Sequence, residues 1–368
     1  MYRNAQEITK GIYAVGAADR DKTHFHGYYV HNGVTYNAYL IDCGDTFALI
    51  DTVHRDKADE LLARIASVTD PKNVSAIIVN HTEPDHSGAL PAVLAATGAK
   101  VYGTVAAAKL LAGMYGINGA ETVKNGETRV VGNRTFTFVA TPMVHWPDNM
   151  VTYLADEQIL FSNDAFGQHY ATENALDTQN DVCTALREAQ HYFANIVMPY
   201  RAQTAKAIEA ALALPLRMIA PSHGVIWTEN IERIARLYRV LTNGETSGAV
   251  LAFDSMWGGT AERAQEAYNE LHKKYAVIQK FDLRDCHMSD VIAALSCAEH
   301  VCIGSPTYNG YPTPRVSTLL AEIEALKPPV KSYSLFGTYA WGGGASKKIT
   351  EKLDSLGYEK TFDLTKIC

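Results

Sequence analysis

The chain has 368 residues, of which 47% are hydrophobic and 20% are charged, which is the composition of an ordinary globular protein. Its length suits two domains of about 100–200 residues each. The formal net charge is −7 and no cluster of Lys or Arg is present, so nucleic acid and anionic membrane surfaces are excluded as main partners. No apolar run approaches the roughly 18 residues that span a bilayer, and the first residues lack the apolar stretch of a signal peptide. We therefore expect a cytoplasmic protein.

Six cysteines are scattered along the chain, and none forms a Cys-x-x-Cys pair. This spacing excludes a zinc ribbon and a rubredoxin-type iron site. In a chain without a signal peptide, we expect the cysteines to be reduced and structural. Any metal must then be held by His and carboxylate side chains.

The first part of the chain mixes strands and helices. Apolar or alternating runs predict strands, and apolar residues spaced three to four apart predict helices. Strands are expected at residues 36–42, 46–51, 74–79, 100–103, 127–140, 150–154, 158–161 and 216–220. Helices are expected at residues 57–67, 106–115, 183–197 and 202–212, and a further one ends at about residue 96. Residues 43–45 have the composition of a hairpin turn.

Small and polar residues at 243–248 predict a linker. We therefore divide the chain into domains at residues 1–245 and 246–368. Beyond the linker, short strands alternate with helices, which predicts a doubly wound parallel sheet. Strands are expected at residues 250–253, 277–281, 301–304, 332–336 and 361–364, and helices are expected to begin near Ala261, Ser289, Arg315 and Ala345.

Four potential metal ligands lie within six positions, directly after the buried strand at residues 74–79. They are His81, Glu83, Asp85 and His86. Ligands at the C-terminal end of a strand lie at the edge of a sheet, where α/β proteins bind cofactors. Their spacing does not fit one face of a helix, whereas a tight loop can carry them around two ions. An N-cap at Asp85 or Ser87 explains only one or two of these residues, so a metal site is the better interpretation.

Three more potential ligands each lie just past the end of a predicted strand. They are His145, Asp164 and His223. Taken singly, such a residue is usually part of a turn or a cap. Because four strand ends deliver His, Asp or Glu, we expect a site for two metal ions.

Three loops of the second domain follow strands and mix Gly with an aromatic residue. Ser and Thr hydroxyls, together with backbone N–H groups beside Gly, can bind a phosphate at a helix N-terminus, and the first loop contains no Lys or Arg. The aromatic residues offer faces for a planar ring. No Gly-x-Gly-x-x-Gly follows the first strand, so flavin mononucleotide (FMN) fits better than a dinucleotide. The expected contacts are Ser255, Met256, Trp257, Gly258, Gly259, Thr260, Ser305, Pro306, Thr307, Tyr308, Asn309, Gly310, Gly337, Thr338, Tyr339, Trp341, Gly342 and Gly343.

These motifs resemble a known family. The first domain is similar to the metallo-β-lactamase superfamily, but Glu83 replaces the second His of the usual His-x-His-x-Asp-His motif. The second domain is similar to flavodoxin. In this order, and with Glu83, the two domains resemble the flavodiiron proteins, which reduce dioxygen to water or nitric oxide to nitrous oxide. The resemblance implies an α/β chain with an N-terminal metallo-β-lactamase-like αββα sandwich, followed by a flavodoxin-like doubly wound parallel sheet and no further domain.

The resemblance also implies two iron ions and their ligands. His81, Glu83 and His145 match the ligands of one iron, Asp85, His86 and His223 match those of the other, and Asp164 matches the bridging carboxylate. In some family members the histidine at the place of His86 turns away from the metal, so its ligation is left open. A carboxylate in place of an imidazole adds a hard anionic ligand, which favours iron over zinc.

For the reaction, the resemblance implies FMN and diiron acting together as an electron store. His24 and Tyr200, or Tyr192, are candidates to line the gas pocket, where a histidine can donate a proton. The expected partners are dioxygen and nitric oxide, an electron donor (rubredoxin, a flavin reductase or reduced deazaflavin) and a second copy of the chain in a head-to-tail homodimer or a dimer of dimers. The alternatives are a zinc-dependent hydrolase with a flavodoxin appendage, and a flavin electron carrier with a structural metal site.

Overall fold

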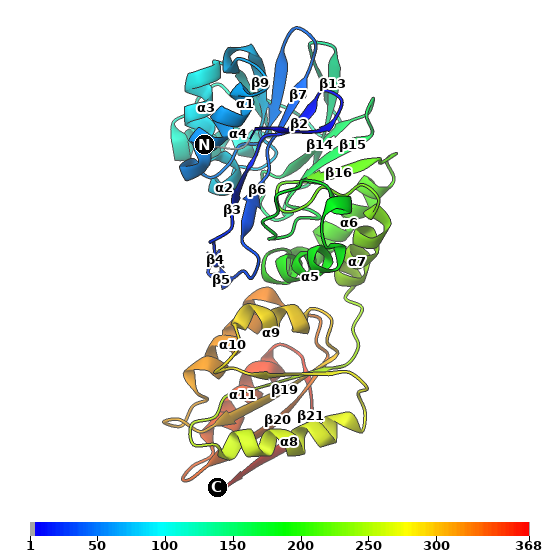
Figure 1. Cartoon of the computed structure of the whole chain (residues 1–368). Coiled ribbons are helices and arrows are strands. Elements are labelled where there is room, and N and C mark those ends of the chain that lie inside the picture. Colours follow the sequence, from blue (N-terminus) through cyan, green and yellow to red (C-terminus); the bar gives the residue numbers. More distant parts are fainter. Residues whose placement is uncertain (1–3, 368) are drawn as a thin grey trace. The chain divides into compact units, whose positions relative to one another are not determined.

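A computed structural model describes residues 4–367, which form two compact units (Figure 1). Within these residues, the first unit consists of residues 4–23, Val30–Ala189 and Ala202–Arg239. The second unit consists of His24–Tyr29, Gln190–Arg201 and residues 240–367. The second unit thus takes two short segments from the first part of the chain, which no change in composition marks.

Two facing sheets form the body of the first unit. The seven-stranded sheet has the order β1 (Gln6–Thr9), β2 (Ile12–Ala14), β7 (Tyr39–Asp42), β8 (Phe47–Ile50), β9 (Val74–Ile78), β10 (Lys100–Gly103) and β11 (Glu121–Thr122). The five-stranded sheet has the order β12 (Thr128–Val131), β13 (Arg134–Ala140), β14 (Met150–Leu154), β15 (Ile159–Asn163) and β16 (Met218–Pro221). Strands β3 (Ala17–Asp19) and β6 (Val34–Tyr36) form a separate antiparallel pair.

The core of the first unit lies between the two sheets. Ile41 and Ile50 of the first sheet belong to one buried cluster with Phe136 and Phe161 of the second, and burying each such side chain contributes about 1.5–3 kcal/mol. Helices α1 (Ala58–Ala66), α3 (Leu90–Thr97) and α4 (Val105–Tyr115) cover the outer face of the first sheet (Figure 1). On the second sheet, α6 (Arg201–Leu212) packs through Ala211. The arrangement is the expected αββα sandwich.

Parallel pairing places the C-terminal ends of neighbouring strands at the same edge of each sheet. Strand β8 pairs parallel with β9, with Ile50 opposite Ile78. Strand β15 pairs parallel with β16, with Asn163 opposite Pro221. The loops that leave these four strands therefore start side by side, and they include three of the four predicted ligand segments.

The second unit contains a five-stranded sheet in which every strand pair is parallel. Its order is β18 (Ile278–Asp282), β17 (Ala249–Phe253), β19 (His300–Pro306), β20 (Ser332–Tyr339) and β21 (Glu359–Ile367). Helix α8 (Gly259–His272) lies on one face, and α9 (Met288–Leu295) and α10 (Pro314–Leu326) lie on the other (Figure 1). Helix α11 (Gly344–Ser355) precedes β21. This is the expected flavodoxin-like topology.

Two expectations need correction. The helix expected at residues 183–197 is α5 (Val182–Tyr192), followed by the π-helical turn η4 (Phe193–Val197) and the 3-10 turn η5 (Met198–Tyr200). Helix α7 (Ile231–Asn243) was not predicted. Its buried Ile234 and Tyr238 lie four residues apart, so an apolar helical pattern was present in the sequence.

Three further findings concern the described part of the chain. The five cysteines in it are all free. Within it, no helix combines the length and the apolar character that crossing a membrane requires. The predicted boundary between residues 245 and 246 lies close to Val240, where the last segment of the second unit begins.

A buried histidine sits between the strands of the second unit. His300 is 1% exposed, and each of its ring nitrogens lies 2.8 Å from a hydroxyl oxygen, that of Ser332 or that of Ser334. Burial, with a smaller effect of Lys274, lowers the pKa of His300 to about 4. The ring is therefore neutral in the folded protein at neutral pH.

This lowered pKa predicts a loss of stability in mild acid. In the unfolded chain His300 titrates near pH 6.5, so its stabilising effect is complete above that pH and is lost as the pH falls toward 4. Between pH 7 and pH 5, the free energy of opening should fall by about 2 kcal/mol more in the wild type than in His300→Gln. Hydrogen exchange of the backbone amides in β19 measures this free energy of opening. His272→Gln, at an exposed site on α8, should keep the wild-type slope, and equal slopes for wild type and His300→Gln would contradict the assignment.

Candidate metal centre and flavin pocket

Seven side chains from four loops of the first unit meet in a buried cluster. The loops follow β9, β13, β15 and β16, and the first includes the short helix α2 (Pro84–Ser87). Each side chain belongs to a residue that is at most 9% exposed. The seven are His81, Glu83, Asp85, His86, His145, Asp164 and His223. All seven predicted metal ligands are thus brought together.

The cluster consists of two groups, each dense enough to hold a metal ion. In each group the potential donor atoms lie within 4.8 Å of one another. The first group contains His81, Glu83, His145 and Asp164, and the second contains Asp85, His86 and His223.

Asp164 lies between the two groups. Its Oδ2 is 3.7 Å from His81 Nε2 and 3.3 Å from His145 Nε2. Its Oδ1 is 3.0 Å from His86 Nε2 and 3.7 Å from His223 Nε2. Each carboxylate oxygen therefore faces one group, which is the arrangement of a bridging ligand.

Each group has its own carboxylate as well. Glu83 Oε2 lies 3.4 Å from His81 Nε2 and 3.2 Å from His145 Nε2. In the second group, Asp85 Oδ2 lies 3.3 Å from His86 Nε2 and 3.2 Å from His223 Nε2. Every histidine of the cluster therefore directs Nε2 toward the carboxylates.

Several buried atoms of the cluster have no hydrogen-bond partner among the described residues. They are both carboxylate oxygens of Asp85, both ring nitrogens of His86 and Oδ2 of Asp164. A buried polar atom left without a partner costs about 1–3 kcal/mol, and more when it is charged. Imidazole nitrogen and carboxylate oxygen are ligands of iron in proteins, so the residues fit a pair of metal ions.

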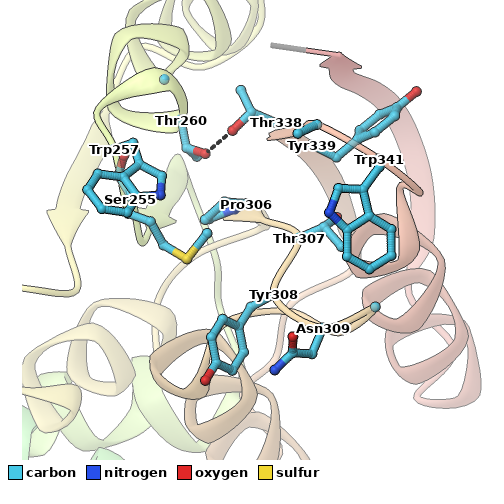
Figure 2. A pocket seen from close by; sticks show the side chains of 14 residues that line it. Ser255, Trp257, Thr260, Pro306, Thr307, Tyr308, Asn309, Thr338, Tyr339 and Trp341 are labelled. Atoms are coloured by element: carbon cyan, nitrogen blue, oxygen red, sulfur yellow. Dashed lines mark hydrogen bonds between the residues drawn. The ribbon is translucent and has the colours of Figure 1, made fainter.

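Three loops of the second unit surround a pocket of about 290 Å³ (Figure 2). The lining residues are Ser255, Met256, Trp257, Gly259, Thr260, Pro306, Thr307, Tyr308, Asn309, Gly310, Thr338, Tyr339, Ala340 and Trp341. Ala340 was not among the expected contacts. Five expected contacts, Gly258, Ser305, Gly337, Gly342 and Gly343, lie in or beside the same loops and are not part of the lining.

The pocket combines a polar end with aromatic walls. The Oγ1 atoms of Thr260 and Thr338 lie 2.9 Å apart and link the first loop to the third. Gly258, with a φ of 95° that favours glycine, precedes the N-terminus of α8. The first backbone N–H groups of a helix have no partner within the helix and can bind an anion, although that of Ala261 donates here to Ser255 Oγ at 3.3 Å. Trp257 and Trp341 are 94% and 80% exposed and stand on opposite sides of the pocket (Figure 2). Exposed aromatic rings around a pocket suit a planar ligand.

Both parts of the chain match known families. Residues 34–224 match the family model described as ODP family beta lactamase, and residues 251–368 match the flavodoxin model. The chain is 40% identical over 360 residues to the nitric oxide reductase of Moorella thermoacetica, covering 96% of this chain and 90% of the relative. It is 36% identical over 364 residues to the rubredoxin-oxygen oxidoreductase of Megalodesulfovibrio gigas, with the same two coverages of 96% and 90%.

Solved structures agree. The rubredoxin oxygen:oxidoreductase of Desulfovibrio gigas superposes with a TM-score of 0.94 at 35% identity, covering 99% of this chain and 94% of that one. The flavodiiron protein of Giardia intestinalis superposes with a TM-score of 0.93 at 29% identity, covering 100% and 93%. The chain belongs to the flavodiiron protein family.

The first ligand loop of this flavodiiron protein is shaped by local interactions. Glu83 precedes the single turn of α2, and Pro84 occupies the first helical position, where its missing N–H costs nothing. Ser87 Oγ donates a hydrogen bond of 2.6 Å to the carbonyl of Thr82. The carbonyl of His86 accepts from both the backbone N–H and the hydroxyl of Thr52. The tight turn places all four side chains on the cluster.

Buried carboxylates behind the loops were missed by the sequence analysis. Asp148 Oδ2 accepts from the backbone N–H and the hydroxyl of Thr82 and lies 3.1 Å from His81 Nδ1. Asp51 accepts a 2.7 Å bond from the N–H of Asn80 and a 3.3 Å bond from Asn163 Nδ2. Because Asn80 precedes His81 and Asn163 precedes Asp164, Asp51 holds two ligand loops together.

Other supports come from backbone atoms. His223 Nδ1 lies 2.6 Å from the carbonyl oxygen of Thr35, which turns its Nε2 toward the cluster. Gln168 donates to the carbonyls of His223 and Val225. Asn37 donates to the carbonyls on both sides of this loop, at Pro221 and Gly224.

The two predicted catalytic residues lie in the second unit of this flavodiiron protein. His24 is exposed on β4 (His24–Phe25), with its ring edge-on to Tyr29 of β5 (Tyr28–Tyr29) at 5.6 Å. Tyr200 is half-buried in η5, whereas Tyr192 is 1% exposed. The metal cluster belongs to the first unit. The catalytic roles of His24 and Tyr200 stay predictions.

One cation near the flavin pocket was also missed. Arg284 follows β18 rather than any of the three predicted loops. Its Nη1 donates a long hydrogen bond of 3.5 Å to the carbonyl of Ser255. Its Nε donates to Asp282 Oδ1 at 2.8 Å, so its charge is largely balanced.

Without metal, the carboxylates of the cluster hold protons on its histidines. Burial by itself lowers the pKa of His81, but hydrogen bonds to Asp148 and Glu83 outweigh burial and raise the pKa well above its usual value. For His86, burial is likewise outweighed by neighbouring carboxylates, and the pKa rises to about 9. The pKa of Asp164 is held well below its usual value, against burial, mainly by His86.

Metal binding should therefore release protons. His81 and His86 carry protons at pH 7 in the metal-free protein and must lose them to bind a metal ion. Adding two equivalents of Fe²⁺ under anaerobic conditions should release more than one proton per chain, measured with an indicator dye in weak buffer. Release should fall as the pH rises through about 9, the pKa of His86. His86→Asn should release fewer protons. Proton release that does not change with pH would contradict the protonation assigned to His81 and His86.

Proposed function

We propose that this chain reduces dioxygen to water and nitric oxide to nitrous oxide, as a detoxifying oxidoreductase with a non-haem diiron centre and FMN. The observation that carries the proposal is the presence, in one chain, of a carboxylate-rich cluster for two metal ions and a flavodoxin-type pocket. Relatives named nitric oxide reductase and rubredoxin-oxygen oxidoreductase support the reaction class. They favour it over a zinc hydrolase or a simple electron carrier.

The seven clustered side chains are the iron ligands in this proposal. His81, Glu83 and His145 would hold one iron, Asp85, His86 and His223 would hold the other, and Asp164 would be shared between the two. The direction of His86 Nε2, 3.0 Å from Asp164 Oδ1, supports His86 as a ligand. An iron pair held there would supply two electrons and a place for a diatomic gas to bind.

Glu83 is the residue that favours iron over zinc. Zinc has no redox chemistry and accepts imidazole readily, whereas carboxylate oxygen is a harder, anionic ligand that stabilises the ferric state. Glu83, Asp85 and Asp164 together bring three carboxylates to two ions. The protein thereby keeps an oxidisable metal in a site whose relatives in the wider superfamily use zinc.

The pocket of the second unit holds FMN in this proposal. Residues 255–260 would bind its phosphate, because their hydroxyls and the N-terminus of α8 supply dipoles. Trp257, Tyr308 and Trp341 supply aromatic faces for the ring. FMN supplies electrons in steps of one or two.

The chain's own groups must then bind gas, exclude water and deliver protons. Reducing dioxygen to two waters consumes four electrons and four protons, and joining two nitric oxide molecules consumes two of each. Burial of the ligand residues to 9% exposure or less keeps bulk water from the reacting atoms. His24 is proposed to donate a proton, and Tyr200 to line the gas pocket.

The proposed partners follow from the need to supply electrons. Rubredoxin, a flavin reductase and reduced deazaflavin are the candidate donors, and the name of the Megalodesulfovibrio gigas relative supports rubredoxin. A head-to-tail homodimer, alone or as a dimer of dimers, is proposed to bring the flavin of one subunit to the irons of the other. A cytoplasmic location stays a prediction.

Glu83→His is the substitution that tests the proposed function. It restores the zinc-type motif, so protein purified from iron-replete cells should lose iron and gain zinc. When the anaerobically reduced protein is mixed with O2 and with NO in parallel, reoxidation should slow by more than about tenfold. Metal analysis and stopped-flow absorbance measure the two effects.

A matched control is Glu229→His, which adds a histidine at an exposed site of the same unit and should leave metal content and both rates unchanged. Two irons and full gas reduction in Glu83→His would contradict the role of that carboxylate. Stoichiometric zinc without iron in the wild type would favour the hydrolase instead.

Electron transfer between subunits predicts a dependence on concentration. If the flavin of one subunit serves the irons of its partner, the activity per chain should fall as the protein is diluted below its dimerisation constant. Gas consumption and sedimentation should be measured over the same concentration range. A monomer with full activity per chain would rule out the proposed dimer as the functional form.

A further inference from the structure

We propose that Asp148 makes the two irons inequivalent by lowering the reduction potential of the iron held by His81. This inference rests on the proposed function, because it assumes that the cluster binds iron. Asp148 is a positioning residue: it acts through the imidazole of His81 and is not itself within the ligand set.

The ligand sets give the two irons no reason to differ. Each group offers two imidazole Nε2 atoms and one carboxylate of its own, Glu83 in one and Asp85 in the other. Each also receives one oxygen of Asp164. A difference in potential must therefore come from the groups behind these ligands.

Behind His81 lies a buried anion. Asp148 is 0% exposed, and its Oδ2 lies 3.1 Å from His81 Nδ1. The same oxygen accepts hydrogen bonds of 2.7 Å and 2.8 Å from the backbone N–H and the hydroxyl of Thr82. The two donors of Thr82, together with the contact to His81, favour the charged form of the carboxylate. The ring of Trp146 also packs edge-on against His81 at 5.1 Å, which fixes the imidazole further.

Behind the second group, the hydrogen bond to a ligand histidine comes from a neutral backbone group and not from a carboxylate. His223 Nδ1 faces the backbone carbonyl of Thr35 at 2.6 Å. His86 Nδ1 has no hydrogen-bond partner in the described part of the chain. Asp51, another buried carboxylate in this region, interacts electrostatically with both His86 and His81, but its hydrogen bonds come from Asn80 and Asn163 and not from a histidine ring.

This asymmetry has an electronic consequence. A carboxylate hydrogen-bonded to a ligating imidazole makes the imidazole a stronger donor, and a negative charge acts strongly in a buried site of low dielectric constant. Both effects stabilise ferric over ferrous iron. The iron of His81 should therefore be reduced last, and the iron held by Asp85 should take the first electron. Each step adds one electron from the reductant, and no bond is formed or broken.

The test is Asp148→Asn, which removes the charge and keeps the volume and an oxygen acceptor for Thr82. The preference for ferric over ferrous iron at the His81 site should fall about tenfold. Changing a group that hydrogen-bonds a metal-bound histidine typically has an effect of this size. This corresponds to a rise of about 60 mV in one of the two potentials. An anaerobic potentiometric titration, followed by electron paramagnetic resonance of the half-reduced centre, measures both potentials.

In the wild type the two one-electron steps should be separate. In Asp148→Asn they should move together, so that less of the half-reduced centre accumulates. Asp148→Glu restores the charge and should recover part of the separation. Asp177→Asn is the control, because Asp177 is equally buried in the same unit and bonds Asn230 rather than a ligand; it should keep the wild-type potentials.

Unchanged potentials in Asp148→Asn, or an equal shift of both, would overturn the proposal. If that variant fails to hold two irons, the titration of the wild type alone tests the proposal. A single two-electron step without a half-reduced centre in the wild type would also overturn the proposal. Gas consumption is not part of this readout. A protein that binds zinc fails the proposed function, whereas an iron-loaded protein with equal potentials fails only the inference about Asp148.

Discussion

Buried negative charge is the constraint on which the rest of the first unit depends. Glu83, Asp85, Asp148 and Asp164 are all at most 9% exposed, and a buried carboxylate is stable only beside cations or hydrogen-bond donors. Metal ions meet this need in the loaded protein, and protonated histidines such as His86 meet it in the metal-free protein. The loops must therefore hold these groups close together in both states, so their supports matter as much as the ligands.

Strand pairing supplies that support, although two residues at the strand ends adopt an unfavourable backbone conformation. Parallel pairing of β8 with β9 and of β15 with β16 starts the loops side by side. Asp51 and Asn163 adopt positive φ angles of 56° and 51°, a conformation that costs about 1–3 kcal/mol outside glycine, although Asp and Asn tolerate it best. The hydrogen bond between these two residues and the bond from Asn80 to Asp51 offset the cost. The strained backbone is thus tied to the loops that carry His81 and Asp164.

The sequence predicted the strands that precede the ligand loops, and the ligand residues themselves, because strands and ligand types are local patterns, but β1, β2 and β11 of the seven-stranded sheet were not predicted. It did not predict the groups behind the ligands, since these come from distant parts of the chain: Asp148 is 67 residues from His81, and Thr35 is 188 residues from His223. Thr35 acts through its backbone carbonyl, which no side-chain pattern reveals. Asp51, by contrast, is the last residue of the strand predicted at residues 46–51, so a search for acidic residues at strand ends could have identified it.

The two units place their functional residues in the same way, but one site is buried and the other is exposed. Both place functional residues after the C-terminal ends of parallel strands, but the metal cluster is buried, whereas Trp257 and Trp341 at the flavin pocket are exposed. A metal pair needs fixed ligands and little water; a flavin that exchanges electrons with a partner needs an open edge. The first flavin loop carries no Lys or Arg, and Arg284 beside it is paired with Asp282. A phosphate bound at this loop would therefore rely on hydroxyls and the dipole of α8, which do not change when a flavin ring takes up or releases electrons.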